Sequence, residues 1–106
     1  MKNEEVRACT VSNVKRVDAS KYQKLAEILG GVANSTRIAI LQILTEYPEV
    51  CTCDLESALS IPQPTVTAHL HKMYERGLLK KREEWRYTYY SINPEYRKMI
   101  DAILGK

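Results

Sequence analysis

The alternation of apolar and polar positions divides the chain into an N-terminal arm and a series of short elements. Residues 1–18 are polar with scattered apolar positions, and we expect them to form an arm outside a single domain of residues 19–106. From about Ala19 to Val32 apolar residues recur at helical spacing, which predicts a first helix. A second helix is predicted after Asn34, a good N-cap residue. Because this segment is apolar nearly all round, it should be central to the core.

Two further helices are predicted in the middle of the chain. The third should run from about Thr52 to Leu59, and the fourth should follow a short break that ends at Pro62 and continue to about Arg76. Proline is tolerated at a helix start but not deeper, and Gly77 is a natural C-terminal stop. Two helices joined by a short turn, the second with a polar outer face, are typical of a helix-turn-helix.

A strand pair and a last helix complete the pattern. Residues 78–82 and 87–92 are strand-like, and we expect residues 83–86 to form the turn between them. A basic hairpin directly after a recognition helix is a wing. Apolar residues at i, i+3, i+4 and i+7 then predict an amphipathic helix from about Pro94 to Leu104. The predicted fold is mainly α with a small β-hairpin, a winged helix-turn-helix in the order α-α-α-α-β-β-α.

Length and composition limit the classes of protein. A chain of 106 residues with 44% hydrophobic residues should form a small core, which pairing with a second copy would enlarge. No apolar run approaches the ~18 residues needed to span a membrane, and the charged N-terminus lacks the apolar core of a signal peptide. These features predict a cytoplasmic protein without a membrane partner. An odd count of three cysteines argues against a disulfide framework and leaves metal binding, redox chemistry or core packing.

The net charge of +3 hides an uneven distribution. Residues 62–90 carry six basic and three acidic residues, whereas residues 45–60 carry four acidic residues and no basic one. The basic stretch is a candidate phosphate-contacting surface. The acidic stretch surrounds two of the cysteines, where it either raises the local affinity for cations or is simply a solvated surface.

Cys51 and Cys53 lie one residue apart immediately before the predicted helix-turn-helix. Soft metals and metalloids prefer thiolate ligands, and a helix N-terminus lowers a thiol pKa and so favours the thiolate. Residues i and i+2 lie on roughly opposite sides of a regular helix, so we expect one ion to take both only if the helix start unwinds. Cys9 of the arm, from the same or the partner subunit, could supply the third thiolate that suits trivalent arsenic or antimony. The alternative is that these cysteines are half-buried core residues or incidental.

The stretch from Leu29 to Ile92, about 60% of the chain, resembles the ArsR/SmtB family of bacterial and archaeal metal-sensing repressors. Three segments carry the likeness. They are residues 34–41 (NSTRIAIL), similar to the family's helix start, residues 51–55 (CTCDL), similar to its thiol metal-binding box, and residues 59–70 (LSIPQPTVTAHL) with Tyr89-Tyr90, similar to its DNA-reading segment. The resemblance implies a homodimer built from the first and last helices, binding to double-stranded operator DNA, and repression that is relieved when the metal binds.

Four positions depart from the family pattern. Glu56 stands where the arsenical branch often has a third Cys, and Cys9 is the one arm thiol where the cadmium and lead branch uses two. Asp101 is present, but no His follows Ile92, so the zinc site of the last helix is not expected. Trp85 stands where the wing turn usually carries Gly, which argues against a tight turn that needs a positive φ.

Three sets of candidate site residues follow. The metal candidates are Cys51, Cys53 and Cys9. The DNA candidates are Gln63, Thr65, Thr67, His71 and Lys72 on the recognition helix, and Arg82 and Arg86 on the wing. The dimer candidates are Tyr22, Leu25, Tyr96, Met99, Ile100 and Ile103. Gln and Thr can bond base edges and wing arginines should touch phosphate or the minor groove, although the same residues also suit an ordinary solvated face.

The leading hypothesis is a dimeric transcriptional repressor that senses a thiophilic metal or metalloid. Arsenite or antimonite is the leading inducer, with cadmium, zinc or another thiophilic ion as alternatives. A thiol redox or sulfide sensor on the same fold is a nearby alternative. From another class, the chain could be a thiol metal chaperone or a winged helix that binds protein. An enzyme is not expected, because no Ser/His/Asp, paired-carboxylate or Gly-rich phosphate motif appears.

Overall fold

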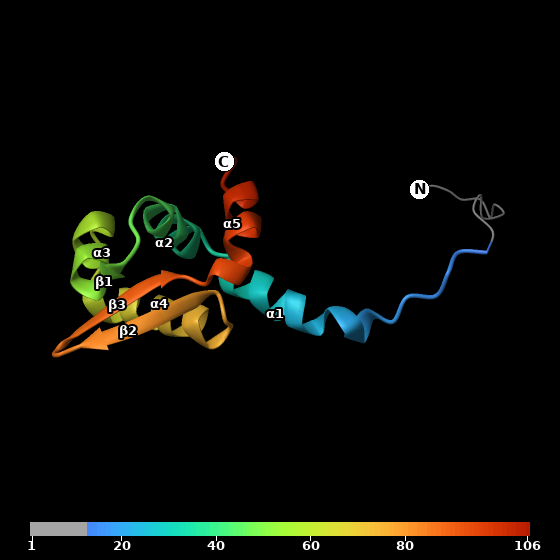
Figure 1. Cartoon of the computed structure of the whole chain (residues 1–106), viewed down its shortest axis with the longest axis horizontal. Helices are drawn as coiled ribbons and strands as arrows, with labels where there is room; N and C mark the ends of the chain where they lie inside the picture. The colour runs from blue at the N-terminus through green and yellow to red at the C-terminus, as the bar shows by residue number, and fades with distance from the viewer. Residues whose placement is uncertain (1–12) are drawn as a thin grey trace.

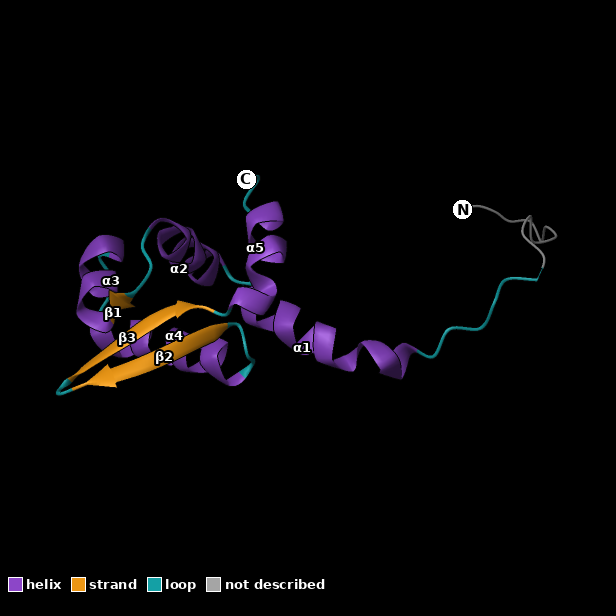
Figure 2. Cartoon of the chain, viewed as in Figure 1, coloured by secondary structure: helices purple, strands orange, loops and turns teal. Residues whose placement is uncertain are grey.

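A computed structural model describes residues 13–106, so Cys9 and most of the predicted arm lie outside the described residues. The elements are the 3-10 turn η1 (Ala19–Tyr22), α1 (Gln23–Val32), α2 (Ser35–Glu46), β1 (Val50–Cys51), α3 (Thr52–Leu59), α4 (Gln63–Glu75), β2 (Leu79–Glu84), β3 (Tyr87–Ile92), the 3-10 turn η2 (Pro94–Tyr96) and α5 (Arg97–Ile103). Figures 1 and 2 show the helices α2, α3 and α4 gathered around the hairpin of β2 and β3, while α1 leads away from them. The predicted winged helix-turn-helix is confirmed.

The core is built from a stripe of apolar side chains on each helix. On α4, Val66, Leu70 and Met73 follow i, i+4, i+7 spacing, and all three are fully buried. The other large side chains that are fully buried are Ile28, Ile40, Leu41, Leu44, Leu55, Leu78 and Ile100. Three of these come from α2, which confirms its predicted central position. The helix-turn-helix and the wing thus rest on one close-packed core, through which a displacement of either is felt by the other.

The recognition helix α4 begins and ends where the sequence places its boundaries. Pro62 is its N-cap, and Gly77 follows its last turn with φ +88°. The amide of Gly77 donates to the carbonyl of Tyr74 at 3.0 Å and the amide of Leu78 to that of Met73 at 3.0 Å. This is the Schellman arrangement, in which a glycine in the left-handed region ends a helix.

A third strand, which the sequence analysis did not predict, ties the cysteines to the wing. The sheet has the order β1-β3-β2, and β1 is only two residues long. It pairs antiparallel with β3, so that Val50 lies opposite Tyr90 and Cys51 opposite Tyr89. The backbone of the first cysteine is therefore part of the same sheet as the wing.

The wing turn is tighter than predicted. β2 continues to Glu84, which pairs with Tyr87, and leaves a loop of only Trp85 and Arg86. Trp85 adopts φ +60°, the left-handed region that two-residue hairpin turns require. The predicted four-residue turn is therefore wrong, and so is the argument that tryptophan excludes a tight turn.

In the part of the chain that the structure describes, no single helix is long and apolar enough to cross a membrane. Only the bent pair Ala19–Val32 and Ser35–Glu46, taken together, meets the length and composition of a span.

Candidate thiol metal site and DNA-binding surface

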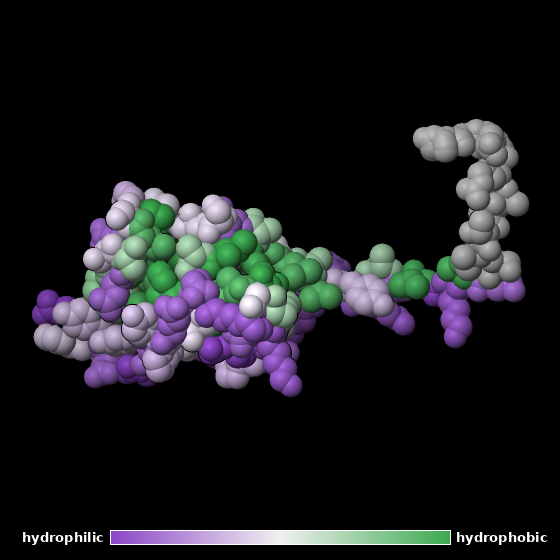
Figure 3. Space-filling model, turned by 90° about the horizontal axis from the view of Figure 1, so that it is seen from above, coloured by the Kyte–Doolittle hydropathy of each residue, from purple (hydrophilic) through white to green (hydrophobic). Residues whose placement is uncertain are grey.

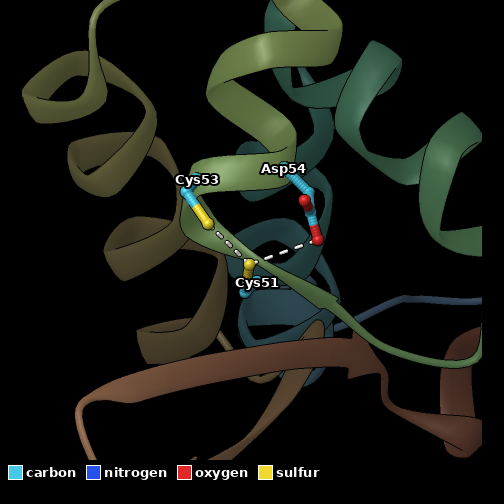
Figure 4. Close-up of side chains that lie close together, drawn as sticks. All are labelled: Cys51, Cys53 and Asp54. Atoms are coloured by element: carbon cyan, nitrogen blue, oxygen red, sulfur yellow. Dashed lines mark hydrogen bonds between the residues drawn. The ribbon is translucent and has the colours of Figure 1, made fainter.

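Cys51 and Cys53, the thiol pair, lie side by side at the start of α3. Cys51 is the N-cap and keeps an extended backbone, with φ −86° and ψ 162°, whereas Cys53 belongs to the first helical turn. The change of backbone conformation between them brings the two Sγ atoms to 2.9 Å, which Figure 4 shows. This is longer than the ~2.05 Å of a disulfide, and both cysteines are free thiols. The expectation that the helix start must unwind before both can share an ion is wrong.

Asp54 adds a carboxylate to the thiol pair. The thiol of Cys51 donates to Oδ2 of Asp54 at 3.2 Å, so its sulfur lies between Cys53 and Asp54 (Figure 4). One ligand atom from each of the three residues lies within 4.8 Å of the others. A metal or metalloid can therefore reach two soft sulfur donors and one hard oxygen donor with little rearrangement.

The thiol of Cys51 is protonated at neutral pH. Burial raises the pKa of Cys51 to about 11, and its contacts with Cys53 and the Asp54 carboxylate act in the same direction, against a smaller opposite effect of the Asp54 amide. The predicted lowering of the thiol pKa by the helix N-terminus is therefore wrong for Cys51. An ion that binds there has to displace this proton.

A cavity of about 300 Å³, the thiol cavity, opens beside the thiol pair. It is lined by residues 51–53, by Gln63 and by residues 86–88. These walls come from the end of β1 and the start of α3, from the first residue of α4, and from the wing turn with the start of β3. Three elements far apart in sequence thus meet at the sulfur atoms.

The predicted DNA-reading side chains lie on the solvent side of α4. Gln63, Thr65, Thr67, His71 and Lys72 are all exposed. Nε2 of His71 lies 3.2 Å from the carboxylate of Glu75, one turn further along. Base and phosphate contacts by these residues stay predictions.

The two predicted wing arginines have different surroundings. The guanidinium of Arg82 donates twice to the Glu49 carboxylate, at 2.9 Å each, and once to Glu84. This contact holds the pKa of Glu49 below its usual range. Arg86 instead lies over the ring of Trp85, at 4.3 Å from its centroid, on the exposed loop. Arg86 is therefore the better phosphate candidate, because the charge of Arg82 is already balanced within the protein.

The comparisons with known proteins point to one family. Residues 34–81 match the model described as "Bacterial regulatory protein, arsR family". The chain is 34% identical over 85 residues to an uncharacterized HTH-type transcriptional regulator of Methanocaldococcus jannaschii. The matched residues cover 78% of this chain and 94% of that regulator. It is also 31% identical over 72 residues to an arsenical resistance operon repressor of Staphylococcus aureus, and the matched residues cover 68% of each chain. This chain belongs to the arsR family.

Among solved structures, the fold matches the homodimeric winged helix-turn-helix DNA-binding domain of a possible ArsR-family regulator from Mycobacterium bovis. The TM-score is 0.75 with 22% identity, covering 86% of each chain. At that identity the likeness concerns the fold alone. Membership of the arsR family makes the protein a DNA-binding transcriptional regulator and not an enzyme, as the sequence analysis predicted.

The sequence analysis of this ArsR-family chain missed a buried arginine that ties the recognition helix to its neighbours. Arg37 of α2 is only 8% exposed, and its Nε donates to the carbonyl of Gly31 at 2.9 Å. Its Nη1 donates to Nδ1 of His69 on α4 at 3.2 Å. Burial lowers the pKa of His69, and the positive charges of Arg37 and Lys72 lower it further. One signal was available, because Arg37 is the only charged residue within the apolar segment 36–45.

One dimer candidate of the ArsR-family chain requires a correction. Ile100 is fully buried within a single chain, where it belongs to the core and cannot contact a partner. Tyr96 and Met99 are partly buried against the same core. The exposed apolar side chains on α5 and the N-terminal helical segment are Ile103 at 44%, Tyr22 at 53%, Leu25 at 45% and Leu29 at 42%. Figure 3 shows hydrophobic residues gathered around α5 and the adjoining part of α1.

Proposed function

We propose that this chain is a dimeric transcriptional repressor that leaves its operator DNA when a thiophilic metalloid, arsenite or antimonite, binds the thiol pair. The observation that carries the proposal is the 2.9 Å contact between the sulfur atoms of Cys51 and Cys53 at the base of the helix-turn-helix. The arsenical resistance operon repressor among its relatives supports the choice of ion.

The binding step balances without a redox change. Two thiols replace two hydroxyl groups of As(OH)3, two As–S bonds form, and the thiol protons leave with the hydroxyl groups as two water molecules. The third position on arsenic keeps its hydroxyl, or is taken by Cys9 of the arm, whose thiol proton leaves with that hydroxyl as a third water molecule, or by the carboxylate of Asp54, which displaces it as hydroxide. Arsenic stays trivalent throughout, so the step needs no oxidant.

The burial of Cys51 argues against Cys51 itself as a redox-sensing thiol and so supports metalloid sensing by the pair. Redox-sensing cysteines are exposed and have a low pKa, because the thiolate is the species that reacts with oxidants. Cys51 is buried and its pKa is raised to about 11. Neutral As(OH)3 meets no such barrier, because each thiol proton leaves with a hydroxyl group as water.

The dimer is proposed from the exposed apolar side chains of α1 and α5. Leu25, Leu29 and Ile103 are each more than 40% exposed, and exposed apolar side chains that form a contiguous patch mark an interaction surface. A second copy would cover them through a two-fold interface. The two recognition helices of such a dimer would read two half-sites about one helical turn apart.

The test combines thiol-to-arsenic absorption in the ultraviolet with fluorescence anisotropy of labelled promoter DNA. The wild-type protein should bind one arsenite per chain and lose DNA affinity by about 5–150-fold. The double variant Cys51→Ser, Cys53→Ser should bind the DNA normally and ignore arsenite. Cys9→Ser tests the arm separately, and it weakens the response only if the arm supplies the third ligand. Full release of the double variant by arsenite would show that the sensor lies elsewhere.

A further inference from the structure

The thiol cavity has walls from both elements that are expected to read DNA. One wall is Gln63, the first residue of the recognition helix, and another is Arg86 with its two neighbours in the wing. Both residues are exposed, and Cys53, which lines the same cavity, is exposed too. The N-terminal residues of a recognition helix are those that reach base edges, and wing residues reach the adjacent backbone. The cavity therefore opens toward the surface that the operator would cover.

The cavity is much larger than a single ion. A water molecule has a share of liquid volume of about 30 Å³. The thiol cavity of about 300 Å³ thus has room for an arsenic atom and a substituent on it. Tyr87 is one of the lining residues, and an aromatic residue at the cavity suits an apolar substituent.

The positive charge of Arg86 at the cavity also suits contact with DNA. The guanidinium of Arg86 is not paired with a carboxylate among the ion pairs of the described residues, and it lies over the ring of Trp85. A guanidinium without a carboxylate partner is available to a DNA phosphate, and a ligand that occupies the cavity beside Arg86 would hinder that contact.

From these observations we infer that ligand and operator DNA compete directly for the thiol cavity and its two walls, Gln63 and Arg86. The ligand class includes trivalent arsenicals that keep one organic group, because two thiols replace two hydroxyl groups and leave the third substituent in the cavity. The release of DNA from the protein then increases with the size of that substituent. This inference rests on the proposed function and specifies how the same site acts on DNA.

The first arm of the experiment measures how fast iodoacetamide alkylates Cys53, in the full-length Cys9→Ser protein with and without promoter DNA. Peptide mass spectrometry separates Cys53 from Cys51. We expect the promoter duplex to slow alkylation of Cys53 at least about tenfold, within the usual range of coupling between two ligands. Glu46→Cys in the same background places a control thiol on the exposed end of α2, outside the cavity lining, and DNA should not protect it.

The second arm compares arsenite with phenylarsonous acid at equal loading of the thiol pair. For phenylarsonous acid two As–S bonds form and two water molecules leave, as for arsenite, so only the substituent differs. The phenyl compound should weaken DNA binding by several-fold more than arsenite. Gln63→Ala, which removes one wall, should reduce this difference.

The outcomes separate this inference from the proposed function. Two outcomes would overturn the shared cavity. In the first, arsenite releases the DNA but the DNA leaves the alkylation rate of Cys53 unchanged; in the second, both arsenicals release the DNA equally. In either case the repressor senses arsenite through a displacement of α3. If neither arsenical changes DNA binding while both occupy the thiols, the proposed function fails and the inference fails with it. Protection of Cys53 by DNA, together with stronger release by the phenyl compound, supports both the proposed function and this inference.

Discussion

Arg37 of α2 donates from Nη1 to Nδ1 of His69 on the recognition helix at 3.2 Å. The same guanidinium donates to the carbonyl of Gly31 at 2.9 Å and to that of Gly30 at 3.4 Å, at the end of α1. One side chain thus joins the helix proposed for the dimer, the central helix and the helix proposed to read DNA. Because His69 accepts this bond, its Nδ1 carries no proton and the ring is neutral.

Replacing Arg37 by methionine should destabilise the fold. The apolar side chain fills most of the same space but leaves the carbonyls of Gly30 and Gly31 and the His69 nitrogen without their donor. An unsatisfied buried polar group costs about 1–3 kcal/mol, so the free energy of unfolding in urea should fall by at least that amount. Arg97→Met is the control, since Arg97 is exposed and its loss should matter less. Equal losses for the two variants would contradict the proposed role of Arg37.

His69 should make stability depend on pH. Its folded pKa is lowered from 6.5 by burial and by the nearby positive charges of Arg37 and Lys72. The unfolded chain therefore binds the proton more readily, so stability is full above about pH 6.5 and is lost as the pH falls through the lowered folded pKa. Urea unfolding of the wild type between pH 5 and 8 should show this slope. His69→Gln keeps an acceptor for Arg37 and removes the titration, so its profile should be flatter over that window.

Sequence periodicity was enough to predict the helices and the wing because the spacing of apolar residues is a local property. It could not predict β1, whose two residues form a strand only through pairing with Tyr89 and Tyr90, far along the chain. The turn at Trp85 follows in the same way from the register of β2 and β3, which overrides the preference for glycine.

The sequence supplied the two cysteines of the candidate site, but neither their geometry nor the neighbouring carboxylate of Asp54. The contact between Cys51 and Cys53 depends on the extended backbone of Cys51 directly before the first helical turn, and sequence patterns do not place a helix boundary that closely. The partner of Arg82, Glu49, lies 33 residues earlier, beyond the reach of any local pattern. Ile100 was placed at the dimer interface because its helix is amphipathic, yet it packs into the core of its own chain.

Dimerisation should depend on exposed apolar residues and not on Ile100. Leu25→Glu and Ile103→Glu place a charge on the proposed interface and should shift sedimentation from dimer to monomer, with the circular dichroism spectrum unchanged. Tyr47→Glu alters an equally exposed residue at the end of α2 and should stay dimeric. An intact dimer for both interface variants would rule out this surface.

Ile100→Asp should unfold the chain instead of producing a folded monomer. Truncating a buried aliphatic side chain alone costs about 2–5 kcal/mol, and the aspartate adds an unpaired polar group in the core. Thermal unfolding followed by circular dichroism should show the loss of the cooperative transition. A folded Ile100→Asp monomer would restore this residue to the interface.

The wing arginines should differ in their effect on the salt dependence of DNA binding. Arg86→Ala should reduce the slope of log K against log salt by about 0.9, the value for one lost phosphate contact. Arg82→Ala should leave the slope nearly unchanged, since Glu49 and Glu84 already balance its charge. Anisotropy titrations at several salt concentrations measure both. Equal reductions would show that Arg82 leaves its carboxylates for phosphate when DNA binds.

Base selectivity should reside in α4. Gln63→Ala and Thr67→Ala should reduce the preference for promoter over random DNA by roughly 1–3 kcal/mol per lost base contact and leave the salt slope unchanged. The same titrations with both duplexes measure this preference. Thr65 lies between them on the helix, and Thr65→Ala tests whether the contact extends to the adjacent exposed position.

The pH dependence of ligand affinity should distinguish a metalloid from a metal cation at the thiol pair. The thiol of Cys51, with a pKa of about 11, is protonated between pH 6 and 8. Cd²⁺ must displace this proton into solution, so its affinity should rise about tenfold per pH unit for each proton released. Arsenite gives up a hydroxyl group for each thiol proton and forms water, so its affinity should stay nearly constant over the same range. Ultraviolet titrations with each ion at pH 6, 7 and 8 measure both slopes, and Cys51→Ser should remove the contribution of Cys51 to the cadmium slope. An arsenite affinity that rises as steeply as that of cadmium would mean that arsenite binding also releases protons into solution, which contradicts the loss of each thiol proton as water.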